Sequence, residues 1–111
     1  MNDRELLELA ARAAGYQFSY SYRSLSSPAV PVILAETGRW RQWDPRHDYG
    51  EALRLAVRLN FTVSICDEFT KVTHGFEEGI IEYADGHKEF ATCMAITRAA
   101  AKIGKSMGGG E

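Results

Sequence analysis

The sequence predicts a single α+β domain: an antiparallel sheet of about four to five strands flanked by three helices, in a two- or three-layer sandwich. Apolar residues recur at helical spacing near both ends and in the centre of the chain. Between them, short segments alternate aromatic or β-branched residues with polar ones, as half-buried strands do. The 111 residues suit one domain, which we assign to residues 1–107, with the glycine-rich residues 108–111 as a disordered tail.

The first helix is predicted to begin at Asn2 and to end at Gly15. The Asn2 side chain can accept a hydrogen bond from the first turn, and Glu5 stands three residues later, which is the spacing of a capping box. Glycine readily adopts the left-handed conformation that ends helices. The apolar stripe of this helix consists of Leu6, Leu9, Ala10 and Ala13, widened by Leu7 and Ala14.

Three strands are predicted between residues 16 and 43. In residues 16–22, aromatic side chains alternate with polar ones; we expect them to form a wall of the core, although they could also line a ligand groove. The serine- and proline-rich residues 24–31 are predicted to be a loop, followed by a buried strand at residues 32–35. The turn at Thr37-Gly38 would let residues 39–43 return as a hairpin partner, unless that segment is irregular.

The central helix is predicted to begin at Asp48, after a turn that contains Trp43 and Pro45. Asp48 is a favourable N-cap, Glu51 completes a second capping box, and Asn60 can end the helix in a left-handed conformation. The expected buried stripe consists of Ala52, Leu55, Ala56 and Leu59, widened by Leu53 and Val57. The expected outer face carries Glu51, Arg54 and Arg58.

After residue 60 we predict three strands and a last helix. The strands cover residues 61–66, 71–76 and 79–83, and their short connections require antiparallel pairing. The helix covers residues 89–106 and carries its cations near its C-terminal end, where they suit the helix dipole. The first and last helices are expected to pack together or on one face of the sheet. The central helix is expected to lie on the sheet beside the Trp43 turn.

Composition and charge exclude several classes of protein. A net charge of −2 gives no electrostatic reason to expect a nucleic acid or a membrane surface as a partner. Neither a signal peptide nor a membrane span is expected, and Cys66 and Cys93 are expected to be reduced thiols, so we predict a cytoplasmic protein. The acidic residues between Asp67 and Glu89 are expected to be a solvated sheet edge, although they could also imitate DNA phosphates.

Three segments resemble small phage and prophage proteins. Residues 43–55 contain the pattern W-x-P-x-x-D-x-G-x-A-L-x-L, in which a tryptophan–proline turn leads into a capped helix. Residues 3–10 and the arginine- and alanine-rich residues 95–101 are similar to the first and last helices of the same group. The closest named family is the phage ABA-sandwich type of small domain. The resemblance implies a phage setting, in the cytoplasm of a bacterial host, and assigns no active site.

The candidate binding residues surround the two tryptophans of the central segment. Guanidinium groups bind phosphate or carboxylate in pairs of hydrogen bonds, and indole faces stack on bases or cations. Trp43 is better explained as a core residue before a proline turn. The candidate site for a partner or an anionic ligand therefore consists of Arg39, Trp40, Arg41, Arg46 and His47.

No catalytic residue, metal site or cofactor is predicted. The three histidines, at positions 47, 74 and 87, lack the spacing of metal ligands, and neither cysteine belongs to a zinc motif. No nucleophile elbow or glycine-rich phosphate loop is present, so an enzyme is disfavoured.

The favoured function is that of a phage-encoded accessory protein that binds and inhibits a host protein, such as a defence factor. One alternative is a binder that sequesters a nucleotide or another anionic small ligand, and another is a structural phage protein. A homodimer is compatible with each of these functions.

Overall fold

The structure is a computed structural model that describes residues 2–21, 29–75 and 78–107. The helices are α1 (Asp3–Ala14), α2 (Tyr49–Arg58) and α3 (Lys88–Met107). The strands are β1 (Phe18–Ser21), β2 (Val30–Leu34), β3 (Trp40–Gln42), β4 (Thr62–Ile65), β5 (Phe69–Thr73) and β6 (Ile80–Tyr83). None of the helices in the described residues is long and apolar enough to cross a membrane.

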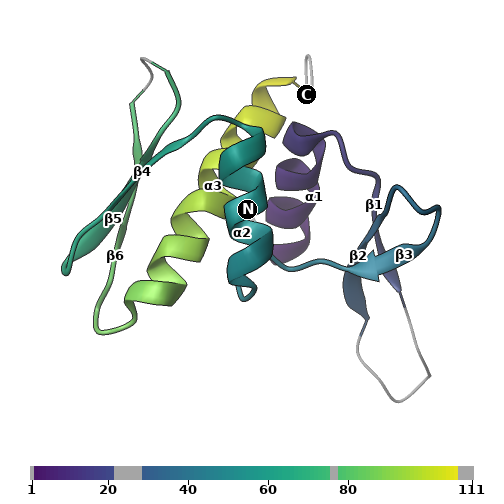
Figure 1. The fold of residues 1–111 in the computed structure, drawn as a ribbon, viewed down its shortest axis with the longest axis horizontal. Coiled ribbons are helices and arrows are strands. Elements are labelled where there is room, and N and C mark those ends of the chain that lie inside the picture. The colour runs from purple at the N-terminus through teal and green to yellow at the C-terminus, as the bar shows by residue number, and fades with distance from the viewer. Residues whose placement is uncertain (1, 22–28, 76–77, 108–111) are drawn as a thin grey trace.

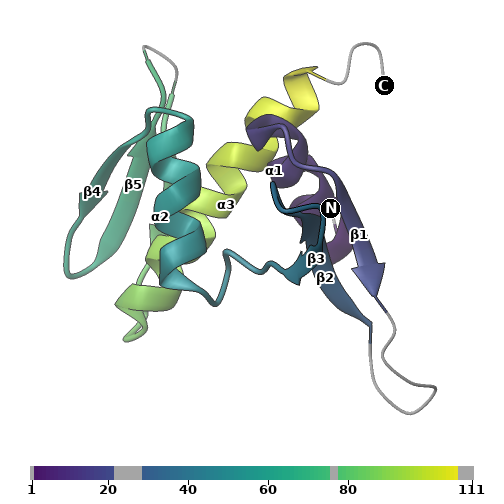
Figure 2. The ribbon, with the colours of Figure 1, turned by 45° about the vertical axis from the view of Figure 1, so that its right-hand side comes forward.

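The three helices occupy the middle of the molecule, with a three-stranded sheet on each side (Figures 1 and 2). The α+β class with antiparallel strands is confirmed, but the prediction of one sheet of four to five strands is wrong. One sheet has the order β1-β2-β3 and the other has the order β4-β5-β6. Within each sheet, strands that are consecutive in the sequence pair with one another, whereas α2 separates β3 from β4 and carries the chain to the opposite side of the helices.

Close packing of α1 against α3 forms the centre of the fold, as the sequence predicts. The Asn2 side chain accepts a hydrogen bond from the Glu5 amide, and Gly15 ends α1 with φ = 80°. At the crossing of the two helices, a Cβ atom on Gly104 would lie 1.9 Å from the carbonyl oxygen of Leu9. Only glycine allows this approach, because any side chain would collide with the α1 backbone.

Helix α2 begins and ends where the sequence predicts, but its faces are distributed differently. Asp48 accepts a hydrogen bond from the Glu51 amide, and Asn60 adopts φ = 57° after the helix. The expectation that Leu53 and Val57 widen the buried stripe is wrong, since they are 63% and 69% exposed. The outward position expected for Glu51 is also wrong, since Glu51 is buried and forms an ion pair with Arg41. The buried face of α2 packs on α3 and not on a sheet.

The sheet β1-β2-β3 is tied to the helices through aromatic side chains. Trp43 is fully buried, and the rings of Tyr16 and Phe18 meet it edge-on at centroid distances of 5.9 and 6.1 Å. The predicted core roles of Trp43 and of these two rings are therefore confirmed. The predicted hairpin is also confirmed, because β3 pairs with β2 in the register Ile33↔Arg41.

The loop predicted at residues 24–31 is partly wrong. Pro31 lies within β2, opposite Tyr20 of β1. A proline is tolerated in a strand where its missing amide hydrogen is not required by the neighbouring strand. Residues 24–28 of this loop lie outside the described residues.

Candidate binding cleft

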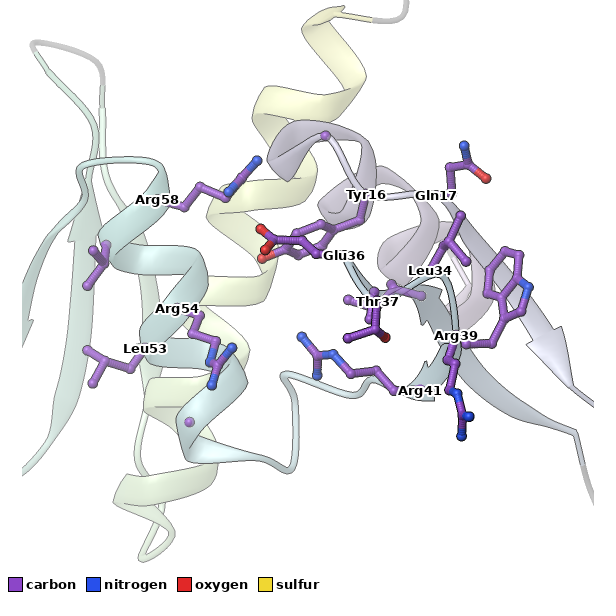
Figure 3. A pocket seen from close by; sticks show the side chains of 16 residues that line it. Tyr16, Gln17, Leu34, Glu36, Thr37, Arg39, Arg41, Leu53, Arg54 and Arg58 are labelled. Atoms are coloured by element: carbon purple, nitrogen blue, oxygen red, sulfur yellow. The ribbon is translucent and has the colours of Figure 1, made fainter.

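An open cleft of about 1340 Å³ lies between α2 and the sheet β1-β2-β3 (Figure 3). The turn before β3 forms one of its walls. This turn is closed by hydrogen bonds from the Gly38 amide to Ala35 and from the Ala35 amide to Arg39, and Gly38 adopts φ = 86°. Helix α2, which begins at the Asp48 cap, forms the facing wall. The polar and aromatic side chains that line the cleft are Tyr16, Gln17, Glu36, Thr37, Arg39, Trp40, Arg41, Arg54 and Arg58.

The side chains of two lining arginines, Arg39 and Arg54, have no hydrogen bond or ion pair to any described residue, and both residues are exposed. Arg41 from β3 and Arg54 from α2 extend into the space between the sheet and the helix from opposite sides (Figure 3). Arg39 lies at the outer rim of the sheet. A guanidinium group without a carboxylate partner keeps its five N–H donors available for a ligand.

Arg58 is partly committed to the fold. Its Nε donates a hydrogen bond to the carbonyl oxygen of Ala14, and its guanidinium group lies 5.3 Å from the centre of the Tyr16 ring. Ala14 is the last residue of α1, where carbonyl groups lack helical partners and the helix dipole attracts a cation. The Arg58 side chain therefore joins α2 to the end of α1 while its remaining donors border the cleft.

Arg41 forms an ion pair with the Glu51 carboxylate on the first turn of α2. The hydrogen bond that Arg41 donates to Glu51 raises the pKa of Arg41, although burial acts in the opposite direction. Since Glu51 is only 8% exposed, the ion pair with Arg41 offsets the cost of burying its carboxylate. Arg41 is therefore primarily a connection between β3 and α2, with a secondary place in the cleft wall.

Arg46 and His47, the other two residues of the predicted site, are absent from the cleft lining. Arg46 binds Asp44 at 2.8 Å and Asp3 at 3.1 Å, and the His47 ring approaches Asp44 at 3.0 Å. Burial would raise the pKa of Asp44, but hydrogen bonds from Arg46 and His47 outweigh it and lower that pKa. We call Asp44, Arg46, His47 and Asp3 the Asp44 cluster, which fixes the turn before α2 to the start of α1.

The cleft is locally positive in a protein of net charge −2. It has four lining arginines against one lining glutamate, Glu36, while Glu51 is already occupied by Arg41. The described residues contain no group of three or more His, Cys, Asp or Glu side chains that could hold a metal ion. The chemistry offered here is the recognition of carboxylate or phosphate groups by guanidinium groups.

Of the five residues predicted for the site, the structure brings Arg39, Trp40 and Arg41 together in the cleft. Sequence reasoning missed the contribution of α2, chiefly Arg54 and Arg58. Their i, i+4 spacing places them on one helical face, which was detectable. The packing of α2 against α3 places this face opposite the hairpin that carries Trp40. Local sequence patterns do not show that packing.

Comparison with known proteins gave no match to a family model, a curated protein or a solved structure.

Proposed function

We propose that this chain is a non-enzymatic binding protein. The cleft between α2 and the sheet β1-β2-β3, which we call the arginine cleft, binds a carboxylate-bearing segment of another protein. The observation that carries the proposal is a pair of exposed arginines that line one cleft: Arg54 on the α2 wall and Arg39 at the outer rim of the opposite sheet. Neither guanidinium group has a carboxylate partner among the described residues. Unsatisfied cations on a surface of otherwise balanced charge favour an acidic partner by electrostatic complementarity.

The surroundings of the arginines favour a protein over a small ligand. Typical small-molecule sites enclose most of the ligand in about 300–1,000 Å³. This cleft is larger and open. Its α2 wall also carries the exposed apolar side chains of Leu53 and Val57. Arginine, aromatic and large apolar residues together are typical of protein–protein interfaces.

The proposal also includes a biological setting, that of a phage protein in a bacterial host. The resemblance to small phage proteins would make the partner a protein of the bacterial host, and occupation of an acidic surface on that protein would inhibit it. A host defence factor is one such partner.

The test is calorimetric titration with a synthetic oligoglutamate peptide at physiological salt. The double variant Arg39→Ala/Arg54→Ala should bind the peptide at least roughly tenfold more weakly, because two charge-assisted contacts are lost. The matched control, Lys102→Ala/Lys105→Ala, removes the same charge from exposed positions on α3 and should leave the affinity within about twofold. Equal losses in both variants would show non-specific charge attraction and would overturn the proposal.

A second candidate is the binding of a nucleotide. It is favoured by Trp40, which is 50% exposed beside Arg39 and could stack on a base. Native mass spectrometry of protein purified from cells separates the two: a copurifying nucleotide that is lost in the Arg39→Ala/Arg54→Ala variant supports this candidate. A nucleotide-free protein that binds the oligoglutamate peptide supports the acidic protein partner.

A further inference from the structure

A second hollow, of about 510 Å³, lies on the other side of α2. Its lining is largely apolar and comes from α2, β4 and α3: Tyr49, Ala52, Leu53, Ala56, Val63, Ile65, Lys88, Glu89, Thr92, Cys93 and Ile96. We call it the apolar groove. Its one lysine, Lys88, already binds Asp67 at 3.1 Å, so the groove offers little unpaired positive charge.

The outer edge of α2 joins the apolar groove to the arginine cleft. Leu53 lines both hollows, whereas Tyr49 lines the apolar groove and Val57 lines the arginine cleft. These three residues stand at i, i+4 and i+8 and are 64%, 63% and 69% exposed. Large apolar side chains in one exposed row are typical of an interaction surface.

The charge distribution decides which occupant fits this surface. A second copy docking α2 against α2 across a two-fold axis would bring Arg54 and Arg58 toward the arginines of the other copy. Like charges disfavour that contact, and the only buried acid of α2, Glu51, is occupied by Arg41. The complement of this surface is instead acidic on one side and apolar on the other.

We propose that the two hollows form one docking surface for an acidic amphipathic segment of a different protein. Carboxylates of the segment bind Arg39 and Arg54, and its large apolar side chains cover Leu53 and enter the apolar groove. This inference rests on the proposed function, and it adds that the acidic segment also carries apolar side chains. Recognition of an amphipathic segment by a groove of this kind uses apolar residues at helical spacing.

The test uses a synthetic peptide of glutamates and leucines at helical spacing, and a second peptide in which every leucine is alanine. The wild-type protein should bind the leucine peptide at least roughly tenfold more tightly, because burial of even one or two leucines contributes that much. The double variant Leu53→Ser/Val57→Ser should lose this advantage while it retains its affinity for the alanine peptide. Ile81→Ser, a change of the same kind at an exposed position on β6, is the matched control.

The outcomes separate this inference from the proposed function. Equal affinity for both peptides, or equal effects of Leu53→Ser/Val57→Ser and Ile81→Ser, overturns the composite surface, while Arg54-dependent binding of the alanine peptide still supports the arginine cleft. Failure of both peptides to bind overturns both proposals. The melting temperatures of the variants should match that of the wild type, because the substituted side chains are exposed.

Discussion

Two arginines at the hairpin, Arg39 and Arg41, are separated by one residue and have different roles. Arg39 has no described partner, whereas Arg41 neutralises the buried carboxylate of Glu51. Removal of Arg41, unlike removal of Arg39, would leave a buried charge unpaired.

Arg41→Ala should lower the free energy of unfolding by about 1–3 kcal/mol, the cost of an unsatisfied buried group. Arg39→Ala should change it by less than about 0.5 kcal/mol, as exposed substitutions usually do. Chemical denaturation measures both. In a Glu51→Gln background the cost of Arg41→Ala should shrink, since the unpaired charge is gone; an unchanged cost would contradict the ion-pair account.

The Asp44 cluster makes a prediction about pH. Because the pKa of Asp44 is lower in the folded protein than in the unfolded chain, its carboxylate stabilises the fold above its unfolded pKa of about 3.9. That stabilisation is lost as the pH falls through the folded value. The difference in unfolding free energy between the wild type and Asp44→Asn should therefore be largest near neutral pH and smaller at about pH 3. A difference that does not change with pH would contradict this role.

At the scale of elements, the crossing of α1 and α3 depends on Gly104. Gly104→Ala should destabilise the protein by about 1–3 kcal/mol, because the new methyl group would overlap the Leu9 carbonyl. This loss should occur although alanine favours a helix over glycine by about 1 kcal/mol. Lys105→Ala, an exposed neighbouring substitution, should have little effect in the same denaturation experiment. Equal or greater stability of Gly104→Ala would show that the helices can separate without cost.

The elements that the sequence predicts well are those with local causes. The caps at Asn2 and Asp48 and the left-handed stops at Gly15 and Asn60 depend on hydrogen bonds and backbone preferences within a few residues. The hairpin at Thr37-Gly38 is local in the same way.

The orientation of α2 is not local. Apolar residues surround most of this helix, so periodicity does not select which of them are buried. The small side chains of Ala52 and Ala56, with Leu55 between them, face the interior and allow α2 to pack on α3, which leaves Leu53 and Val57 outside. For this reason the sequence does not show that α2 forms one wall of the cleft.

At the scale of the whole molecule, the two sheets are separated because the helices lie between them (Figure 2). The sequence could not show this division, because the alternation of apolar and polar residues along a strand does not determine which sheet that strand joins. The arrangement places the hairpin with Arg39 on one side of α2 and β4 on the other. The two hollows therefore share α2 as a common border.

Isotope-edited NMR titration of the protein with the glutamate–leucine peptide tests this account most directly. We predict that the side-chain Nε–H signals of Arg39 and Arg54 shift together with the backbone amides of Leu53 and Val57, while those of Ile81 do not move. Shifts confined to the outer face of β4-β5-β6, or the absence of shifts at Arg54, would contradict the account.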